Sequence, residues 1–345
     1  MNQNKYPSIS VVIPAYNEEK NLSRLIPSLA KQTYPRQKIE YLLIDDGSTD
    51  KTRKLVQDFG MKIIPVKTHD IELNKGIGMH AAKNEYVYWL DCDMEICSNN
   101  FFELLVRPLL ANKKIIGSFT REFALDCEPK PDNLLLRFIS HDDLQRDPLY
   151  QFFSPSVEST VVKEGKDYKV CIFIPSKIPP VGRILYRRRQ LLETEVGKIK
   201  PYIDLEATEI VARAGHQFFA FVTEAKIRHF HAQSLKELIH KRLRNMERDY
   251  LPNLEKKYYR WFDYRNRKDV VKITFWVIWT NLLLPELIRG IVKGIVNKDK
   301  AFLLQPIVSL ATTDAIIYGF LTKSSGRKLA RNMFINLLKK PLVIF

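Results

Sequence analysis

The first 110 residues alternate between short apolar runs and segments with helical spacing, and this alternation restricts the possible folds more than any other feature. Between the runs, apolar residues recur with helical spacing, although Pro27 predicts a kink or an early stop in the first helix. Strands that alternate with helices pair in parallel through right-handed crossovers. We therefore expect an α/β fold with a mostly parallel central sheet and flanking helices. The apolar runs are ISVVI (9–13), YLLI (41–44), KIIPV (62–66) and YVYWL (86–90).

Polar and acidic residues follow three of these runs, as PAYNEE (14–19), DDGS (45–48) and DCDME (91–95). Open sheets of this kind bind ligands beyond the carboxyl ends of their strands. Asp91 and Asp93 cannot both point into an apolar core, because a buried unpaired charge is too costly. At a strand end they could instead hold Mg²⁺ or Mn²⁺, which neutralises charge on a leaving diphosphate. A solvated acidic loop is the alternative for this pattern taken alone.

The segment 202–222 predicts a helix from about Asp204 that stops at Gly215 and is followed by an aromatic strand. The stretch NKGIGMHAA (74–82) fits G-x-G-x-x-A, a fingerprint of dinucleotide binding. That fingerprint should directly follow the first strand, which it does not do here. We therefore expect an ordinary turn from loop to helix.

Positive charge is concentrated in the last third of the chain. Residues 226–345 contain 24 Lys/Arg and 9 Asp/Glu, whereas residues 1–225 contain 31 and 30. Such a basic region favours a nucleic acid or an anionic membrane surface as partner. No nucleic acid is expected, because no nucleic-acid-binding motif is evident and the same region carries apolar segments.

Those apolar segments, 270–296 and 301–321, are each marginal for a spanning helix of about 20 residues. Aromatic residues such as Phe275, Trp276 and Trp279 are typical of the membrane interface. We therefore expect membrane association, with the basic stretch 238–268 along the cytoplasmic surface and both spanning and monotopic arrangements open.

The four cysteines form no C-x-x-C pair, so free buried thiols in a reducing compartment are expected. The N-terminus has no apolar signal region. The expected location is the cell membrane, with the catalytic domain on its cytoplasmic side. The cysteines are Cys92, Cys97, Cys127 and Cys171.

Three segments, SVVIPAYNEE, YLLIDDGSTDKT and NKGIGMHAAKNEYVYWLDCD, closely resemble family 2 glycosyltransferases of the GT-A fold in their order and spacing. The resemblance is strong over 8–110 and looser over 180–245. It implies a UDP- or GDP-sugar donor, Mg²⁺ or Mn²⁺ as cofactor, and an inverting transfer. The implied acceptor is a membrane-linked glycan or a polyprenyl-phosphate carrier.

The resemblance also implies roles for the residues at the strand ends. Asp46 binds the base, which agrees with the ability of a carboxylate to accept from an imide N–H. Asp93 is the expected direct metal ligand, and Asp91 is expected to bind ribose or metal-bound water. The other candidates are Pro14, Tyr16 and Glu18 for base or ribose, Glu95 as a further metal ligand, and Lys75 for a phosphate.

An inverting transfer needs a base for the acceptor hydroxyl. Relatives often carry Glu-Asp at the start of the late helix, whereas YIDLEA here has Ile203 in place of the first acid. Asp204 is the candidate base, with Glu206 in reserve. The alternative for Asp204 is a carboxylate that only stabilises the helix N-terminus.

His229 and His231 in RHFHAQS (228–234) are candidates for the metal or the diphosphate, although histidines there are often merely hydrogen-bonded. The guanidinium groups of Arg187, Arg188 and Arg189 could bind an acceptor phosphate or simply be solvated.

The predicted organisation is a catalytic domain, basic juxtamembrane helices and membrane-associated C-terminal helices. A nucleotide-sugar-binding protein without turnover is the alternative, favoured by Ile203, and a nucleic-acid-binding protein is a weaker one. The boundaries are 1–235 (with a nucleotide-sugar-binding part, 8–110, and an acceptor part, 111–235), 236–269 and 270–345.

Overall fold

The computed structural model describes residues 6–121, 127, 129–139, 153–247, 251, 262–263 and 265–338, with side chains as far as 335. The chain divides into two compact units, which are described separately below. The first contains residues 1–129 and 155–230, and the second contains residues 130–154 and 231–345.

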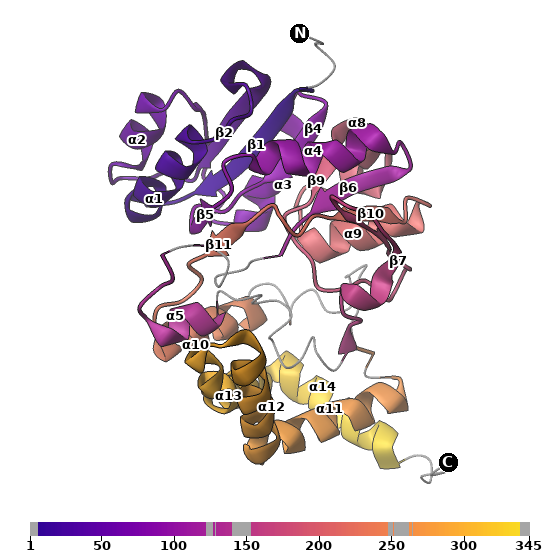
Figure 1. Cartoon of the computed structure of the whole chain (residues 1–345). Helices are drawn as coiled ribbons and strands as arrows, with labels where there is room; N and C mark the ends of the chain where they lie inside the picture. Colours follow the sequence, from indigo (N-terminus) through magenta and orange to yellow (C-terminus); the bar gives the residue numbers. More distant parts are fainter. Residues whose placement is uncertain are drawn as a thin grey trace. The chain divides into compact units, whose positions relative to one another are not determined.

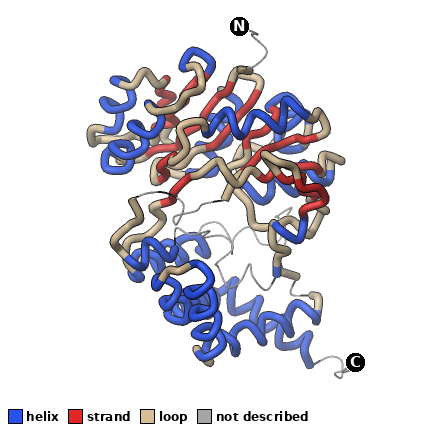
Figure 2. The backbone as a smooth tube through the Cα atoms, in the orientation of Figure 1, coloured by secondary structure: helices blue, strands red, loops and turns tan. Residues whose placement is uncertain are grey.

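The first unit is built on a nine-stranded sheet with helices on its faces (Figure 1, Figure 2). Seven of the strands run in one direction, and only β9 and β8 run against them. The expected α/β fold with a mostly parallel sheet is therefore confirmed. The strand order is β3 (Lys62–Pro65), β2 (Ile39–Asp45), β1 (Ile9–Ala15), β4 (Tyr86–Trp89), β9 (Leu185–Arg187), β6 (Ile115–Phe119), β10 (Phe218–Phe221), β8 (Lys169–Ile172) and β7 (Val161–Glu164).

Helices cover both faces of the sheet because the side chains of β1 alternate between them. Val11 and Ile13 point into a core shared with α1 (Glu19–Ala30) and α4 (Phe101–Ala111). Val12 faces α3 (Ile71–Ala81) on the other side. The remaining helices of this unit are α2 (Thr52–Asp58), α8 (Arg188–Glu193) and α9 (Asp204–Arg213). The predicted stop at Pro27 is wrong, since α1 continues to Ala30.

The G-x-G motif lies inside α3, which begins five residues before the motif, where Asp70 caps the helix by accepting from two backbone N–H groups. A Cβ on Gly78 would lie 2.1 Å from Cγ1 of Val12, and one on Gly76 would lie 1.6 Å from the carbonyl oxygen of Lys200. These glycines therefore let α3 approach the sheet and the loop before α9, and the motif is explained by packing.

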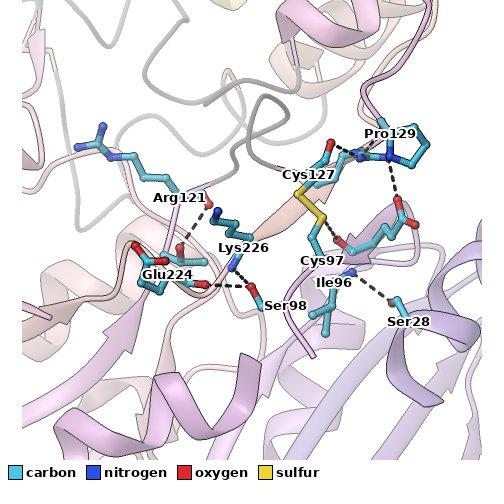
Figure 3. The surroundings of a disulfide bond; sticks show 12 residues. Ser28, Ile96, Cys97, Ser98, Arg121, Cys127, Pro129, Glu224 and Lys226 are labelled. Atoms are coloured by element: carbon cyan, nitrogen blue, oxygen red, sulfur yellow. Dashed lines mark hydrogen bonds and ion pairs between the residues drawn. A yellow bond between two sulfur atoms is a disulfide. The ribbon is translucent and has the colours of Figure 1, made fainter. Parts of the chain in front are cut away.

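A second sheet pairs β5 (Met94–Ile96) with β11 (Ile227–His229). Strand β5 begins directly after Asp93, the second acid of the D-x-D motif. Cys97, at the end of β5, forms a disulfide with Cys127 (Figure 3). The prediction of four free thiols is therefore wrong for this pair, although Cys92 and Cys171 are free and buried. The two cysteines meet because Arg228 of β11 donates to the carbonyl oxygens of Cys127 and Pro129, which holds this segment beside β5.

The second unit is helical in its described part. Helix α13 packs against α10, α11, α12 and α14. Residues 300–322, which include α13, are long and apolar enough to cross a membrane, but 56% of the window that decides this is buried within the structure. The helices are α5 (Leu134–Ile139), α10 (Leu235–Asn245), α11 (Arg267–Asn281), α12 (Leu284–Asn297), α13 (Gln305–Thr322) and α14 (Ser324–Leu338). Much of the predicted basic stretch 238–268 lies outside the described residues.

Candidate active site

Lys75 lies at the centre of a charged cluster at the carboxyl end of β4. Its side chain is 9% exposed, and Nζ lies 3.7 Å from Asp91 Oδ1, 3.6 Å from Asp204 Oδ2 and 3.7 Å from Glu72 Oε2. Burial lowers the pKa of the Lys75 ammonium, but the three carboxylates outweigh it and hold that pKa above its ordinary value. The first acid of the D-x-D motif and the candidate base thus share one cation.

Arg183 connects the same carboxylates to a histidine. Its Nε lies 3.7 Å from Asp91 Oδ2, its Nη2 lies 3.4 Å from His229 Nδ1, and its backbone N–H donates to Asp204 Oδ1 at 3.2 Å. The residue has φ +53°, a conformation that costs energy in a residue with a Cβ. The turn before β9 therefore directs a guanidinium into the cluster.

Asp93, the second acid of the D-x-D motif, contacts a histidine. His229 Nε2 lies 3.2 Å from Asp93 Oδ2, and the backbone N–H of Phe230 donates to the Asp93 carbonyl oxygen. Ligand atoms of Asp93, His229 and His231 all lie within 4.8 Å of one another. Within the first unit, Asp93 and His229 supply one carboxylate and one imidazole, a donor pair that suits a divalent ion such as Mn²⁺.

Glu95 is engaged elsewhere. Its carboxylate pairs with Arg228 at 3.1 Å across the β5–β11 ladder, where the two residues are register partners. Glu95 is outside the group formed by Asp93 and the two histidines. The structure thus assigns Glu95 a contact that stabilises the small sheet.

The ends of β1 and β2 form a second cluster. Asp46 is 5% exposed, and its carboxylate accepts from the backbone N–H of Thr68 at 2.9 Å and from Asn74 Nδ2 at 3.1 Å. Tyr16 is 55% exposed beyond the end of β1, where its ring is open to a ligand. Glu18 accepts from Asn21 Nδ2, and Pro14 pairs with Ile44 inside the sheet. A carboxylate can accept hydrogen bonds from a nucleobase, and an aromatic ring can stack on one.

The neighbouring acid, Asp45, stabilises the turn that follows β2 through hydrogen bonds. Arg53 donates to its carboxylate at 2.6 Å, and the backbone N–H of Ser48 donates to it at 3.1 Å. Burial raises the pKa of the Asp45 carboxyl, but the hydrogen bonds from Ser48 and Arg53 outweigh it, so that pKa lies below its ordinary value. Asp45 therefore shapes the turn.

Asp204 is the first residue of α9, as the sequence predicts, and Gly215 follows the helix with φ +93°. Ile203 occupies the N-cap position and makes no side-chain cap. The preceding Tyr202 stacks on Trp89 of β4 with ring centroids 3.7 Å apart, and its backbone N–H donates to the backbone carbonyl oxygen of Glu72. This stacking fixes the start of α9 against β4 and so brings Asp204 to Lys75.

Comparison with known proteins gives a partial family match. Residues 10–155 match the family model described as "Glycosyl transferase family 2", a stretch that is less than half of the 345-residue chain. Within the matched stretch, the D-x-D acids and Asp46 lie at the carboxyl edge of the parallel strands, as the GT-A fold leads one to expect.

Two curated relatives illustrate the similarity. The poly(ribitol-phosphate) beta-N-acetylglucosaminyltransferase TarS of Staphylococcus aureus is 35% identical over 91 residues, which cover 24% of this chain and 16% of TarS. The glycosyltransferase GlyG of Streptococcus pneumoniae is 39% identical over 108 residues, 29% of this chain and 35% of GlyG. The matched stretches span only 14% to 45% of the lengths of such relatives.

Solved structures of glycosyltransferases are also similar to this chain. The mannosyltransferase PcManGT of Pyrobaculum calidifontis, in complex with GDP-Man and Mn²⁺, has a TM-score of 0.46 at 15% identity and covers 97% of this chain and 81% of its own. TarS 1–349 of S. aureus in complex with UDP has a TM-score of 0.44 at 14% identity and covers 98% of this chain and 94% of its own.

The three consecutive arginines lie away from the cluster around Lys75. Arg187 pairs with Tyr86, the first residue of β4, and its guanidinium donates to carbonyl oxygens of Ile115 and Leu109. Arg188 begins α8, and Arg189 is 92% exposed in a pair with Glu193. The prediction of an acceptor-phosphate role is not supported, because β9 runs antiparallel to β4 and carries these residues to the opposite edge of the sheet.

Two residues of the cluster escaped the sequence analysis, Arg183 and Glu72. Arg183 stands four residues before the arginine run, at the other end of β9 and hence at the carboxyl edge of β4. Only the pairing of β9 with β4 shows this placement. Glu72 belongs to the first turn of α3, in a stretch that the sequence analysis treated as the approach to a turn.

Proposed function

We propose that this chain transfers a sugar from a nucleotide-diphosphate donor to a hydroxyl or phosphate acceptor, with inversion at the anomeric carbon. A membrane-linked glycan or a polyprenyl-phosphate carrier is the proposed acceptor class. The observation that carries the proposal is the shared contact of Lys75 with Asp91 and Asp204, because it unites the donor-binding edge and the candidate base in one cluster.

In this proposal the base acts from the start of α9. Asp204 accepts the proton of the acceptor oxygen while that oxygen forms a bond to the anomeric carbon. The bond from the anomeric carbon to the diphosphate breaks at the same time, and its electron pair leaves with the nucleoside diphosphate. Lys75 and Arg183 are the cations close enough to the cluster to receive the diphosphate oxygens.

Asp93, His229 and His231 are the residues proposed to hold Mg²⁺ or Mn²⁺. Their ligand atoms lie within 4.8 Å of one another. The Asp93 carboxylate suits either ion, whereas the imidazoles favour Mn²⁺ over Mg²⁺, which prefers oxygen ligands. When bound, the ion would neutralise negative charge on the diphosphate. Asp46 and Tyr16 are proposed to receive the nucleobase.

The test is Asp204→Asn, assayed for sugar transfer to lipid extracts and for donor binding by thermal shift with UDP- and GDP-sugars, with and without Mn²⁺. We expect transfer to fall by about 100-fold or more while donor binding persists. The exposed Asp58→Asn on α2 is the matched control and should keep full activity. Undiminished transfer by Asp204→Asn would exclude it as the base, and failure of every donor to stabilise the wild type would contradict the proposal itself.

A donor-binding protein without turnover is a second candidate, because Ile203 replaces the acid that relatives often carry beside the base. Donor binding in the wild type without transfer to any acceptor would favour it. Ile203→Glu should then gain transfer.

A further inference from the structure

Helix α12 turns its apolar side chains outward. Its exposed residues recur with helical spacing, and all of them except the last, Asn297, are Leu, Ile or Val. Glu286 and Gly290 on the opposite side are buried, and Lys293 is partly buried. A helix on the surface of a water-soluble domain has the reverse arrangement. The exposed residues are Leu284, Leu287, Ile288, Ile291, Val292, Ile295 and Val296, with exposed fractions from 38% to 74%.

A buried polar network fixes this orientation. Glu286 accepts hydrogen bonds from Trp279 Nε1 at 2.7 Å, Gln305 Nε2 at 2.6 Å and Ser309 Oγ at 3.0 Å. Arg289 adds an ion pair to the same carboxylate at 2.9 Å. Rotation of α12 to bury its apolar side would leave these polar groups without partners, which is costly. The outward apolar face is therefore built into the helical unit.

Helix α11 adds a second apolar stripe of the same kind. Val271, Phe275, Ile278 and Leu282 are each at least 42% exposed and recur every three or four residues. The two helices meet at a bend of 74°. Helix α12 has 14 residues, which gives a length of about 21 Å, whereas a bilayer core is about 30 Å thick. Neither helix can cross a membrane by itself.

The charges around these stripes favour an anionic surface. Residues 265–338 contain 12 Lys/Arg and 4 Asp/Glu. Glu286 and Asp299, two of the four acids, are buried in ion pairs. Exposed lysines stand on α11 at 268 and 272, and Lys298 and Lys300 follow α12. A second copy of the chain would bring like charges together, whereas anionic lipid headgroups would neutralise them.

We propose that the outward faces of α11 and α12 dock in the headgroup region of one leaflet of an anionic bilayer, with α12 lying in the plane of the interface. The apolar stripe enters the boundary of the acyl chains, and the flanking lysines contact lipid phosphates. This proposal does not depend on sugar transfer, because lipid binding can be measured without donor or acceptor.

Flotation of the full chain with phosphatidylcholine vesicles, with and without phosphatidylglycerol, tests the proposal. We expect the protein to float with the anionic vesicles and to bind more weakly as salt rises. Ile295→Glu combined with Val296→Glu should reduce binding by about tenfold or more, because charge is placed at the most exposed part of the stripe. Val162→Glu, at an apolar position in β7 that is 56% exposed, should bind like the wild type.

Three results would overturn the proposal. They are failure of the wild type to float, wild-type binding by the double variant, and a lipid-free dimer that light scattering detects and the double variant abolishes. The last result would make a second copy of the chain the occupant of this face. Since residues 295 and 296 are exposed, circular dichroism should show that the double variant keeps its fold.

Discussion

Replacing Lys75 with methionine should destabilise the protein by about 3 kcal/mol. The ammonium lies 3.6 to 3.7 Å from three carboxylates, and each such pair is worth roughly 4 to 5 kcal/mol at an effective dielectric constant of about 20. Desolvation of the ammonium offsets much of this sum. Breaking a buried pair by removing one partner typically costs about 3 to 5 kcal/mol, and the partial exposure of Asp91 and Asp204 favours the lower end.

A double-mutant cycle with Asp204→Asn measures this link directly by urea unfolding at neutral pH. In the wild type, Asp204→Asn removes a partner of Lys75 and should destabilise the protein. In Lys75→Met, the same substitution removes a carboxylate that has lost its cation, so it should be neutral or stabilising. We expect a coupling free energy of about 1 to 3 kcal/mol.

Lys51→Met is the matched control, since Lys51 pairs with Glu19 at 3.4 Å but is 73% exposed. It should change the unfolding free energy by less than about 1 kcal/mol. Additive effects of Lys75→Met and Asp204→Asn would refute the reasoning, because they would show that the shared cation does not couple the carboxylates.

Three further predictions concern other parts of the domain. Gly78→Ala should lower the unfolding free energy by about 1 to 3 kcal/mol, because its Cβ would meet Val12 at 2.1 Å; unchanged stability in urea would contradict this. Folding lowers the pKa of the Asp45 carboxyl, which donors including Arg53 hold in its ionised form. The ionised carboxylate therefore stabilises the folded protein at pH values above the ordinary carboxyl pKa. This stability is lost as the pH falls through the pKa of Asp45 in the folded protein. In Asp45→Asn, the unfolding free energy should therefore decrease less between about pH 5 and pH 2 than it does in the wild type. An equal decrease in both proteins would contradict this prediction. His229→Ala should weaken Mn²⁺ binding by about tenfold or more in calorimetry, and wild-type affinity would exclude this residue as a ligand.

The edge of the sheet at which the candidate site lies could be predicted because it follows from strand direction. Alternating strands and helices require parallel pairing, and parallel pairing brings Asp46, Asp91 and Asp93 to one edge. The start of α9 at Asp204 was likewise readable from helical spacing and from Gly215. These inferences depend only on local periodicity and a general rule of topology.

Arg183 and the disulfide could not be predicted because long-range pairing determines them. The segment VGRILYRRR does not reveal that β9 runs antiparallel to β4, yet this direction decides which arginine reaches the site. Cys97 and Cys127 are 30 residues apart without a spacing signature. They meet because Arg228 holds the backbone of Cys127 beside β5.

The orientation of α12 illustrates a further limit of the same kind. Periodicity at 3.6 residues predicts that a helix has an apolar face and a polar face, but it does not say which face points inward. That choice depends on whether the rest of the unit offers partners to Glu286, and Trp279, Gln305 and Ser309 do so from the two helices that neighbour it in the chain. Once the carboxylate is satisfied inside, the apolar face must find its own partner outside. A hydrocarbon boundary is the solvent that suits such a face, and the surplus of lysine and arginine around it fits an anionic one.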